Sequence, residues 1–221
     1  MEYFTILGER NSGTNFLQYA LLSNFKIKHQ QPIHKHFFGH KEFTENMDKT
    51  IYICIIRDPI EWIDSFFKKL HHIPPENKNL DALLKNEFYS IYEDGPLKSK
   101  EIIEDRNIFT KERYKNIFEM RKIKNDYFLN ISKKVKYYYI LRYEDLNNDY
   151  ENVLNKLANQ FQLTKKNDVF VKVPKYKGTY NELYFKKPIL LSLDIQDYIK
   201  QHVDIEQEHK LGYLLDIAPL I

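Results

Sequence analysis

Two glycines with four residues between them stand near the start of the chain, in Gly8-Glu9-Arg10-Asn11-Ser12-Gly13-Thr14-Asn15. This G-x-x-x-x-G spacing is typical of a phosphate-binding loop, whose backbone N–H groups hold an anion at a helix N-terminus. Thr14 occupies the position of the lysine with which ordinary nucleoside triphosphatases reach the β- and γ-phosphates. The loop therefore predicts anion binding without this lysine. A tight turn capped by Ser12 or Thr14, with no ligand, is the alternative.

Such a loop needs a strand before it and a helix after it. Residues 3–8 are apolar and predict a short strand. The segment after Gly13 predicts a helix, because one face carries Phe16, Leu17, Ala20 and Leu21. Short donors and one positive charge add to the loop's capacity for an anion, namely Ser12, Thr14, Asn15 and Arg10.

A second anion-binding position is predicted at the end of the next clear strand. Residues 51–56 form a continuous apolar run, which suits a parallel strand buried on both faces. Arg57 follows this strand, and Pro59 suits the first turn of a helix that continues to about residue 70. Ser65 then lies about two turns into that helix. Because ligands bind outside the carboxyl ends of parallel strands, we expect Arg57 and the glycine loop to face the same crevice.

The rest of the chain completes an alternating pattern of strands and helices. We expect a short strand and loop over 26–40, a long amphipathic helix over 110–133, a strand over 135–141, a helix over 149–161, and helical segments to about residue 212. This order predicts an α/β fold with a central parallel sheet flanked by helices. Residues 1–221 are expected to form a single domain, in which the helical stretch 72–135 is a lid or an acceptor-pocket insertion.

Composition excludes several classes of protein. The 221 residues are 43% hydrophobic and 29% charged, a mixture typical of a globular domain. A net charge of +3 does not by itself imply nucleic-acid binding. The single cysteine, Cys54, excludes a disulfide framework and is interpreted as a buried thiol. With no apolar run of about 20 residues and no signal-like N-terminus, we expect a cytoplasmic protein without a membrane span.

Four short motifs occur in a characteristic order. They are Asn11-Ser12-Gly13-Thr14-Asn15-Phe16, Arg57 with Ser65 eight residues later, Tyr143-Glu144-Asp145, and Tyr176-Lys177-Gly178. Together with "HKLGY" near the end, they resemble the P-loop sulfotransferases, which use 3′-phosphoadenosine-5′-phosphosulfate (PAPS). The resemblance extends from residue 3 to about residue 213. It implies a P-loop NTPase-like three-layer sandwich, with PAPS as donor and 3′,5′-ADP as product.

The resemblance also implies roles for individual residues. The glycine loop would hold the 5′-phosphosulfate, Arg57 and Ser65 would hold the 3′-phosphate, and Phe16 would flank the adenine. Tyr143, Lys177 and Gly178 would complete the cofactor site. Two residues depart from the family pattern, because Asn11 replaces a lysine that assists the leaving phosphate and Tyr176 replaces an arginine. Arg10, beside Asn11, is the candidate substitute.

A base must accept the proton of the attacking group, and the segment Ile33-His34-Lys35-His36-Phe37-Phe38-Gly39-His40 supplies candidates. Relatives often carry a lysine and a histidine here, so His36 is interpreted as the base and Lys35 as a stabiliser of the bridging oxygen. A histidine with a pKa near 6.5 suits this role at neutral pH. One alternative is that the segment is a histidine-rich surface loop without a catalytic role. Another is a metal site formed by His34, His36 and His40, which their spacing disfavours. A third is that Glu9 serves as the base.

These observations favour a sulfotransferase that acts on a hydroxyl or amine of an unknown small-molecule or sugar acceptor, with no metal required. The rivals are a P-loop nucleotide kinase or other phosphotransferase, and a nucleotide-binding module without activity. Other features receive structural interpretations. Trp62 is expected to pack in the core, Glu144 and Asp145 to cap a helix, and the lysines of 98–136 to lie on solvated helix faces.

Overall fold

The computed structural model describes residues 1–43, 47–172 and 188–215. These residues form two compact units, each assembled from segments that are distant in sequence. The first unit takes its described residues from 1–36, 41–58 and 131–188, and the second takes them from 37–40, 59–130 and 189 onward. The expectation of a single domain over 1–221 stays a prediction.

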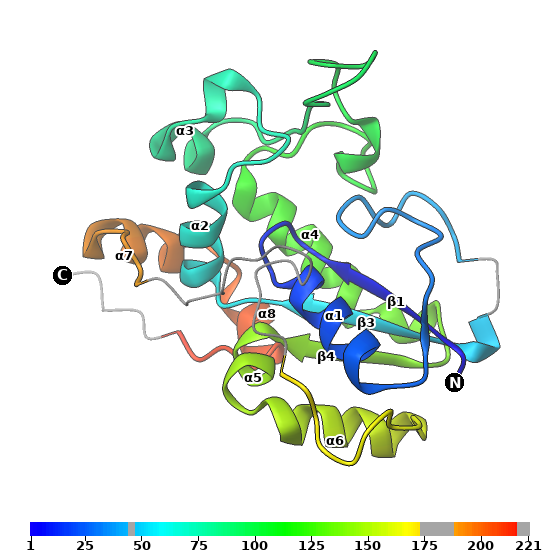
Figure 1. Ribbon diagram of the computed structural model, residues 1–221. Helices are drawn as coiled ribbons and strands as arrows, with labels where there is room; N and C mark the ends of the chain where they lie inside the picture. The colour runs from blue at the N-terminus through cyan, green and yellow to red at the C-terminus, as the bar shows by residue number, and fades with distance from the viewer. Residues whose placement is uncertain (44–46, 173–187, 216–221) are drawn as a thin grey trace. The chain divides into compact units, whose positions relative to one another are not determined.

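A parallel sheet of four strands forms the centre of the first unit (Figure 1). The strands are β1 (Tyr3–Gly8), β2 (Lys28–His29), β3 (Thr50–Ile56) and β4 (Tyr138–Arg142), in the order β2-β1-β3-β4. All three strand pairings are parallel. Every residue of β3 is buried, as the uninterrupted apolar run requires for a strand covered on both faces. The predicted α/β class with a central parallel sheet is therefore confirmed.

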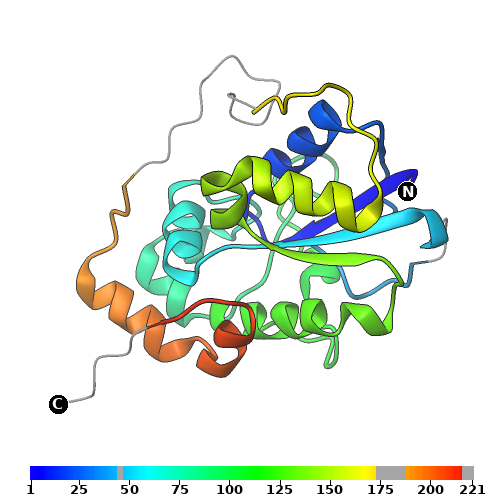
Figure 2. The same ribbon diagram turned by 90° about the horizontal axis from the view of Figure 1, so that it is seen from below.

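Three helices of the first unit belong to the core of this sheet. They are α1 (Thr14–Asn24), α5 (Tyr143–Asn148) and α6 (Tyr150–Phe161). Alternate strand residues supply one side of the core, and helix residues supply the other: Phe4, Ile6, Ile51, Ile53 and Ile55 pack with Leu17, Leu21, Leu146, Leu154 and Leu157. Figure 2 shows α1 and α6 on the same side of the sheet. This packing fixes the start of α1, and hence the glycine loop, beside the ends of β1 and β3.

The second unit is helical in its described part. Its α-helices are α2 (Pro59–Lys68), α3 (Leu80–Lys85), α4 (Ile117–Leu129), α7 (Leu193–His202) and α8 (Ile205–Lys210). Short 3-10 helices occur in both units, at Met47–Lys49, Pro75–Asn77, Ile103–Asp105 and Ile131–Lys133. Trp62 is 1% exposed and packs in the core of the second unit, which confirms its predicted role.

The helix predicted over 110–133 is shorter than the pattern indicated. It begins at Ile117, because the side chain of Asn116 accepts hydrogen bonds from the N–H groups of Phe118 and Glu119 at 3.0 and 2.9 Å. Residues 107–112 instead form a loop that is closed by a 2.9 Å bond from Asn107 N to Glu112 O. The prediction ignored the capping potential of Asn116 and was wrong for the residues before it.

The interpretation of the lysines in 98–136 as solvated was wrong for Lys124. Lys124 is 2% exposed, and its Nζ donates to Oδ1 of the fully buried Asp105 at 2.6 Å. Ser90 donates to the other oxygen of Asp105. A buried charge is tolerated only with such partners. These partners come from other segments of the second unit and are not visible in the local pattern of α4.

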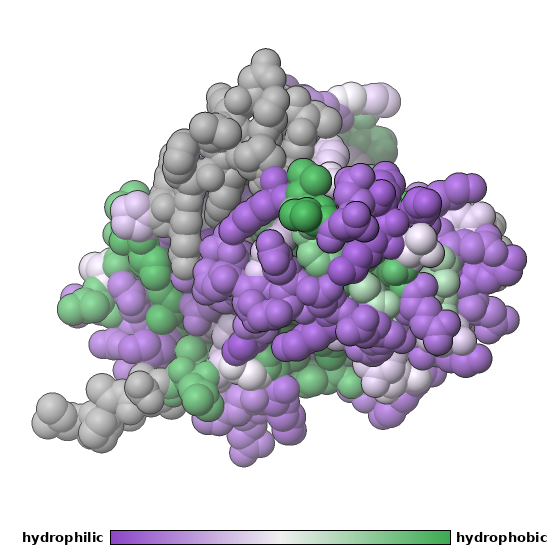
Figure 3. All heavy atoms as spheres, turned by 60° about the horizontal axis from the view of Figure 1, so that its bottom comes forward, coloured by the Kyte–Doolittle hydropathy of each residue, from purple (hydrophilic) through white to green (hydrophobic). Residues whose placement is uncertain are grey.

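One face of the molecule is mainly hydrophilic. Figure 3 shows a face on which hydrophilic side chains predominate, with hydrophobic ones scattered among them. None of the helices in the described ranges is long and apolar enough to cross a membrane.

Candidate anion-binding site

The glycine loop joins β1 to α1 through two residues in the left-handed backbone region, Asn11 with φ 63° and Gly13 with φ 97°. Ser12 donates to the carbonyl oxygen of Glu9 twice, from its N–H at 3.1 Å and from its Oγ at 2.6 Å. Its hydroxyl is thus committed to the turn. The helix begins after Gly13, the N-cap residue, which has no side chain that could accept a capping bond. The capping part of the alternative is therefore wrong, because Gly13 occupies the N-cap position and the Ser12 hydroxyl bonds to Glu9 O, while a tight turn without a ligand stays an untested alternative.

The first turn of α1 is suited to an anion. It contains no acidic residue, and the N–H groups at a helix start carry a partial positive charge. A helix start alone is a weak signal, so the charged groups around it decide the argument.

The segment after β2 folds back onto the loop. Gly8 N donates to Lys35 O at 3.0 Å, and His36 Nδ1 bonds to Gly8 O at 2.6 Å. The Nζ of Lys35 donates to Oδ1 of Asn15, in the first turn of α1, at 2.6 Å. The structure thus brings Lys35 and His36 to the loop, while their catalytic roles stay predictions.

His36 is a neutral imidazole at neutral pH. Burial lowers its pKa well below the ordinary value, and the nearby positive charges of Lys35 and Arg10 lower it further. Its Nδ1 carries the proton, because the partner at 2.6 Å is a carbonyl oxygen that can only accept. In this tautomer the basic lone pair is on Nε2. The group therefore has the protonation state of a general base.

Arg57 lies at the loop as well. It follows β3 directly, and its Nη1 donates to Asn11 O at 3.2 Å. Its guanidinium carbon lies 4.4 Å from the centroid of the Tyr143 ring, a cation–π geometry. The first unit thus places Arg57 and Lys35 against the loop, and Arg10 close enough to influence His36.

The first turn of α5 contacts this cluster through Tyr143 and Glu144. Oε1 of Glu144 accepts from Asp58 N at 3.0 Å, next to Arg57 in sequence. Asp145 pairs with Arg142 at 2.7 Å. Neither carboxylate caps α5, so the capping interpretation was wrong, because both acidic groups are engaged by partners outside the helix backbone. Sequence reasoning missed the Arg57–Tyr143 contact, although pairing of the two strands would have indicated it.

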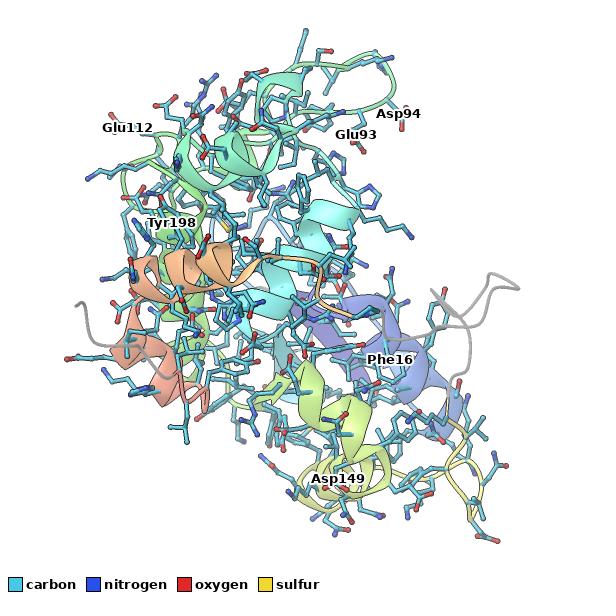
Figure 4. All side chains as sticks on the ribbon, turned by 90° about the vertical axis from the view of Figure 1, so that its left-hand side faces the viewer. Phe16, Glu93, Asp94, Glu112, Asp149 and Tyr198 are labelled. Atoms are coloured by element: carbon cyan, nitrogen blue, oxygen red, sulfur yellow. The ribbon has the colours of Figure 1, made fainter. Side chains whose placement is uncertain are left out.

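Phe16 projects from α1 (Figure 4). The centroid of its ring lies 6.3 Å from that of Tyr143 and 6.0 Å from that of Tyr150. It is partly buried within an aromatic group of the first unit. A role beside an adenine stays a prediction.

For several predicted site residues, a place at the loop stays a prediction. Ser65 is on α2, which belongs to the second unit, so its pairing with Arg57 stays a prediction. Lys177 and Gly178, with Tyr176, lie outside the described residues.

The remaining histidines of the 34–40 segment have separate partners. His34 Nδ1 accepts from His36 N at 3.2 Å. His40 belongs to the second unit, where its Nε2 bonds to Arg106 O at 3.1 Å. Residues 1–43, 47–172 and 188–215 contain no group of three His, Cys, Asp or Glu side chains that could hold a metal ion.

Two other features of the first unit are separate from this cluster. Burial raises the pKa of the Cys54 thiol above its ordinary value, in line with the predicted inert thiol. A hollow of about 530 Å³ is lined by Lys136, Tyr137, Tyr138, Tyr139, Ile140, Gln160 and Phe161. It begins at the opposite end of β4 from Arg142.

The chain was compared with models of protein families, with curated proteins and with solved structures. None of the three comparisons found a match.

Proposed function

We propose that this chain is a sulfotransferase that transfers a sulfuryl group from PAPS to a hydroxyl or amine of a small-molecule or sugar acceptor. The observation that carries the proposal is the convergence of Arg57 and Lys35 on the loop and the first turn of α1, which contains no acidic residue. Such a site fits a ligand with more than one anionic group. The order of the four sequence motifs supports PAPS as that ligand.

Each group has a role in this chemistry. When bound, PAPS supplies the sulfuryl group and leaves as 3′,5′-ADP. The N–H groups of residues 13–15 would hold the 5′-phosphosulfate, while Arg57 would hold the 3′-phosphate. Lys35 and Arg10 would balance the charge that develops on the leaving oxygen, in place of the lysine that Asn11 replaces. Nε2 of His36 would take the proton of the attacking acceptor.

A nucleotide kinase is the first rival, and a nucleotide-binding module without activity is the second. Both bind a nucleotide, but a kinase holds a triphosphate, with Mg²⁺ and the loop lysine. Thr14 stands in place of that lysine. Arg57, which donates to Asn11 O of the loop, would meet a 3′-phosphate that neither ADP nor ATP carries.

We expect 3′,5′-ADP to bind at least about tenfold more tightly than ADP or ATP, without Mg²⁺. The lost contact is a charge-assisted hydrogen bond worth roughly 1.5–3 kcal/mol, or about a ten- to hundredfold change in affinity. Isothermal titration calorimetry of the three nucleotides, each with and without Mg²⁺, measures this difference. Arg57→Ala should remove the preference. ATP–Mg²⁺ that binds as tightly as 3′,5′-ADP would favour the kinase instead.

His36→Asn should lower the transfer rate by about 10²-fold or more, as expected for loss of a general base, while nucleotide affinity stays nearly unchanged. The amide Nδ2 of the new side chain can replace Nδ1 as donor to Gly8 O, so the loop keeps its support and only the base is lost. His36→Ala should remove both the base and the hydrogen bond that supports the loop. Stopped assays with a radiolabelled sulfuryl donor and a panel of acceptors measure the rate.

The pH profile provides the control for this assignment. Because the pKa of His36 in the folded protein lies below its ordinary value, the base stays neutral and the wild-type rate should not fall between pH 8 and about 6.5. The rate should fall once the pH passes below the lowered pKa. A wild-type rate in His36→Asn would transfer the role of base to His34 or Glu9.

A further inference from the structure

Tyr143 contacts both elements of the proposed anion site. Its ring lies under the guanidinium of Arg57, 4.4 Å from the guanidinium carbon to the centroid. It also lies so close to Gly13 that a Cβ on Gly13 would be 2.5 Å from Cδ2 of the ring. Tyr143 is only 3% exposed, so its ring is buried where it contacts the loop and Arg57.

The sheet register explains why these residues meet. Ile56 is the register partner of Arg142 in the parallel pair of β3 and β4. Arg57 and Tyr143, the first residues after these two strands, therefore follow the sheet at the same level. The bond from Asp58 N to Glu144 Oε1 at 3.0 Å then holds the following pair together. Consecutive contacts of this kind fix the backbone on both sides of Arg57.

We propose that Tyr143 is a positioning residue, which sets Arg57 in a fixed place relative to the loop of residues 8–15. The identity of the ligand rests on the proposed function, but the coupling of Arg57 to the loop through Tyr143 does not. An arginine has many rotamers, and a charged group binds a phosphate tightly only when its position is fixed before binding. The family resemblance implied that Tyr143 belongs to the cofactor site. Its burial instead favours an indirect role.

The role has a specific consequence for recognition. A ring that holds Arg57 affects the part of the ligand that Arg57 reaches, and affects the 5′ end less. Loss of the ring should therefore lower affinity for 3′,5′-ADP more than affinity for ADP. A general loss of structure would instead weaken both nucleotides alike.

The first test compares Tyr143→Leu with Tyr143→Phe by calorimetric titration of 3′,5′-ADP and ADP. We expect Tyr143→Leu to weaken 3′,5′-ADP by about five- to thirtyfold, the range expected for a cation–π contact in a partly desolvated site, and to change ADP by less than about threefold. Tyr143→Phe keeps the aromatic face and should retain the wild-type ratio. Tyr143→Met replaces Tyr143→Leu if that variant does not fold. Equal losses for both nucleotides, or no rescue by phenylalanine, would overturn the proposal.

The second test needs no ligand and separates this inference from the proposed function. Urea unfolding of Arg57→Met, Tyr143→Leu and the double variant, followed by far-UV circular dichroism, forms a double-mutant cycle. We expect the shift of the urea midpoint caused by Arg57→Met to be smaller when Tyr143 is already replaced. Additive shifts would contradict the inference. A wild type without preference for 3′,5′-ADP would contradict the proposed function alone, and the cycle would then decide whether Tyr143 holds Arg57.

Discussion

Arg121→Met should lower the free energy of unfolding of the second unit by about 3–5 kcal/mol, the usual cost of leaving one partner of a buried ion pair alone. Arg121 is 4% exposed and Glu208 is 1% exposed. The guanidinium donates to both oxygens of Glu208, from Nε at 2.6 Å and from Nη2 at 2.8 Å. This pair connects α4 to α8, and Asn125 adds a bond to the same carboxylate at 3.3 Å. Without Arg121, Glu208 remains in the core as an uncompensated charge.

The neighbouring residue provides a matched control. Lys122 forms an ion pair with Asp204 at 2.7 Å, also between α4 and the start of α8, but its side chain is 54% exposed. Lys122→Met should therefore cost no more than about 1 kcal/mol. Asp204 can keep its bond from Gln207 N in this variant.

Urea unfolding followed by the fluorescence of Trp62 measures both variants. Trp62 is the single tryptophan of the chain and belongs to the second unit, and the Arg121 guanidinium carbon lies 5.1 Å from its ring centroid. The baselines will differ between variants, so the fitted midpoints and slopes are compared and the intensities are not. The double variant with Glu208→Met should recover much of the loss, because two apolar groups leave no buried charge. Equal effects of Arg121→Met and Lys122→Met would contradict the assignment of a buried, stabilising pair.

The central strands β1 and β3 were predictable because their apolar sequences match their burial. β3 is a run of apolar residues, and such a run between polar segments is explained only by burial on both faces. The glycine loop was predictable for a similar reason, since the position of Gly13 between strand and helix requires a tight turn. Arg57 could be placed near this loop by a general rule on the carboxyl ends of strands.

The buried polar groups could not be predicted in this way. Nothing in the neighbours of Lys124 indicates that Asp105, 19 residues earlier, will meet it. Similarly, Glu144 was read as a helix cap from its local position, whereas its partner Asp58 lies 86 residues away. Such contacts depend on which segments the fold brings together, and a pattern of single residues does not contain that information. Tyr143 differs, because strand register would have predicted its contact with Arg57.

Gly13→Ala should lower the free energy of unfolding by about 2–5 kcal/mol and weaken nucleotide binding at the loop. Two costs add. At φ 97° an alanine takes a left-handed conformation that costs about 1–2 kcal/mol for a residue with a Cβ. The new Cβ would also lie 2.5 Å from Cδ2 of Tyr143, and such overpacking typically costs about 1–3 kcal/mol. Far-UV circular dichroism in urea measures the stability, and calorimetry with 3′,5′-ADP measures binding.

Gly95→Ala separates the two costs. Gly95 also has a positive φ, 75°, but a Cβ there would meet nothing within 4 Å, so only the backbone cost of about 1–2 kcal/mol applies. The contact with Tyr143 should explain the part of the Gly13→Ala destabilisation that exceeds the backbone cost. In that case Gly13→Ala should lower the free energy of unfolding by less when Tyr143 is replaced by alanine, and the loss should approach that of Gly95→Ala. A Gly13→Ala cost equal to that of Gly95→Ala in the wild-type background would show that the loop can move away from Tyr143. In that case the close contact with Tyr143 would not hold Gly13 in place.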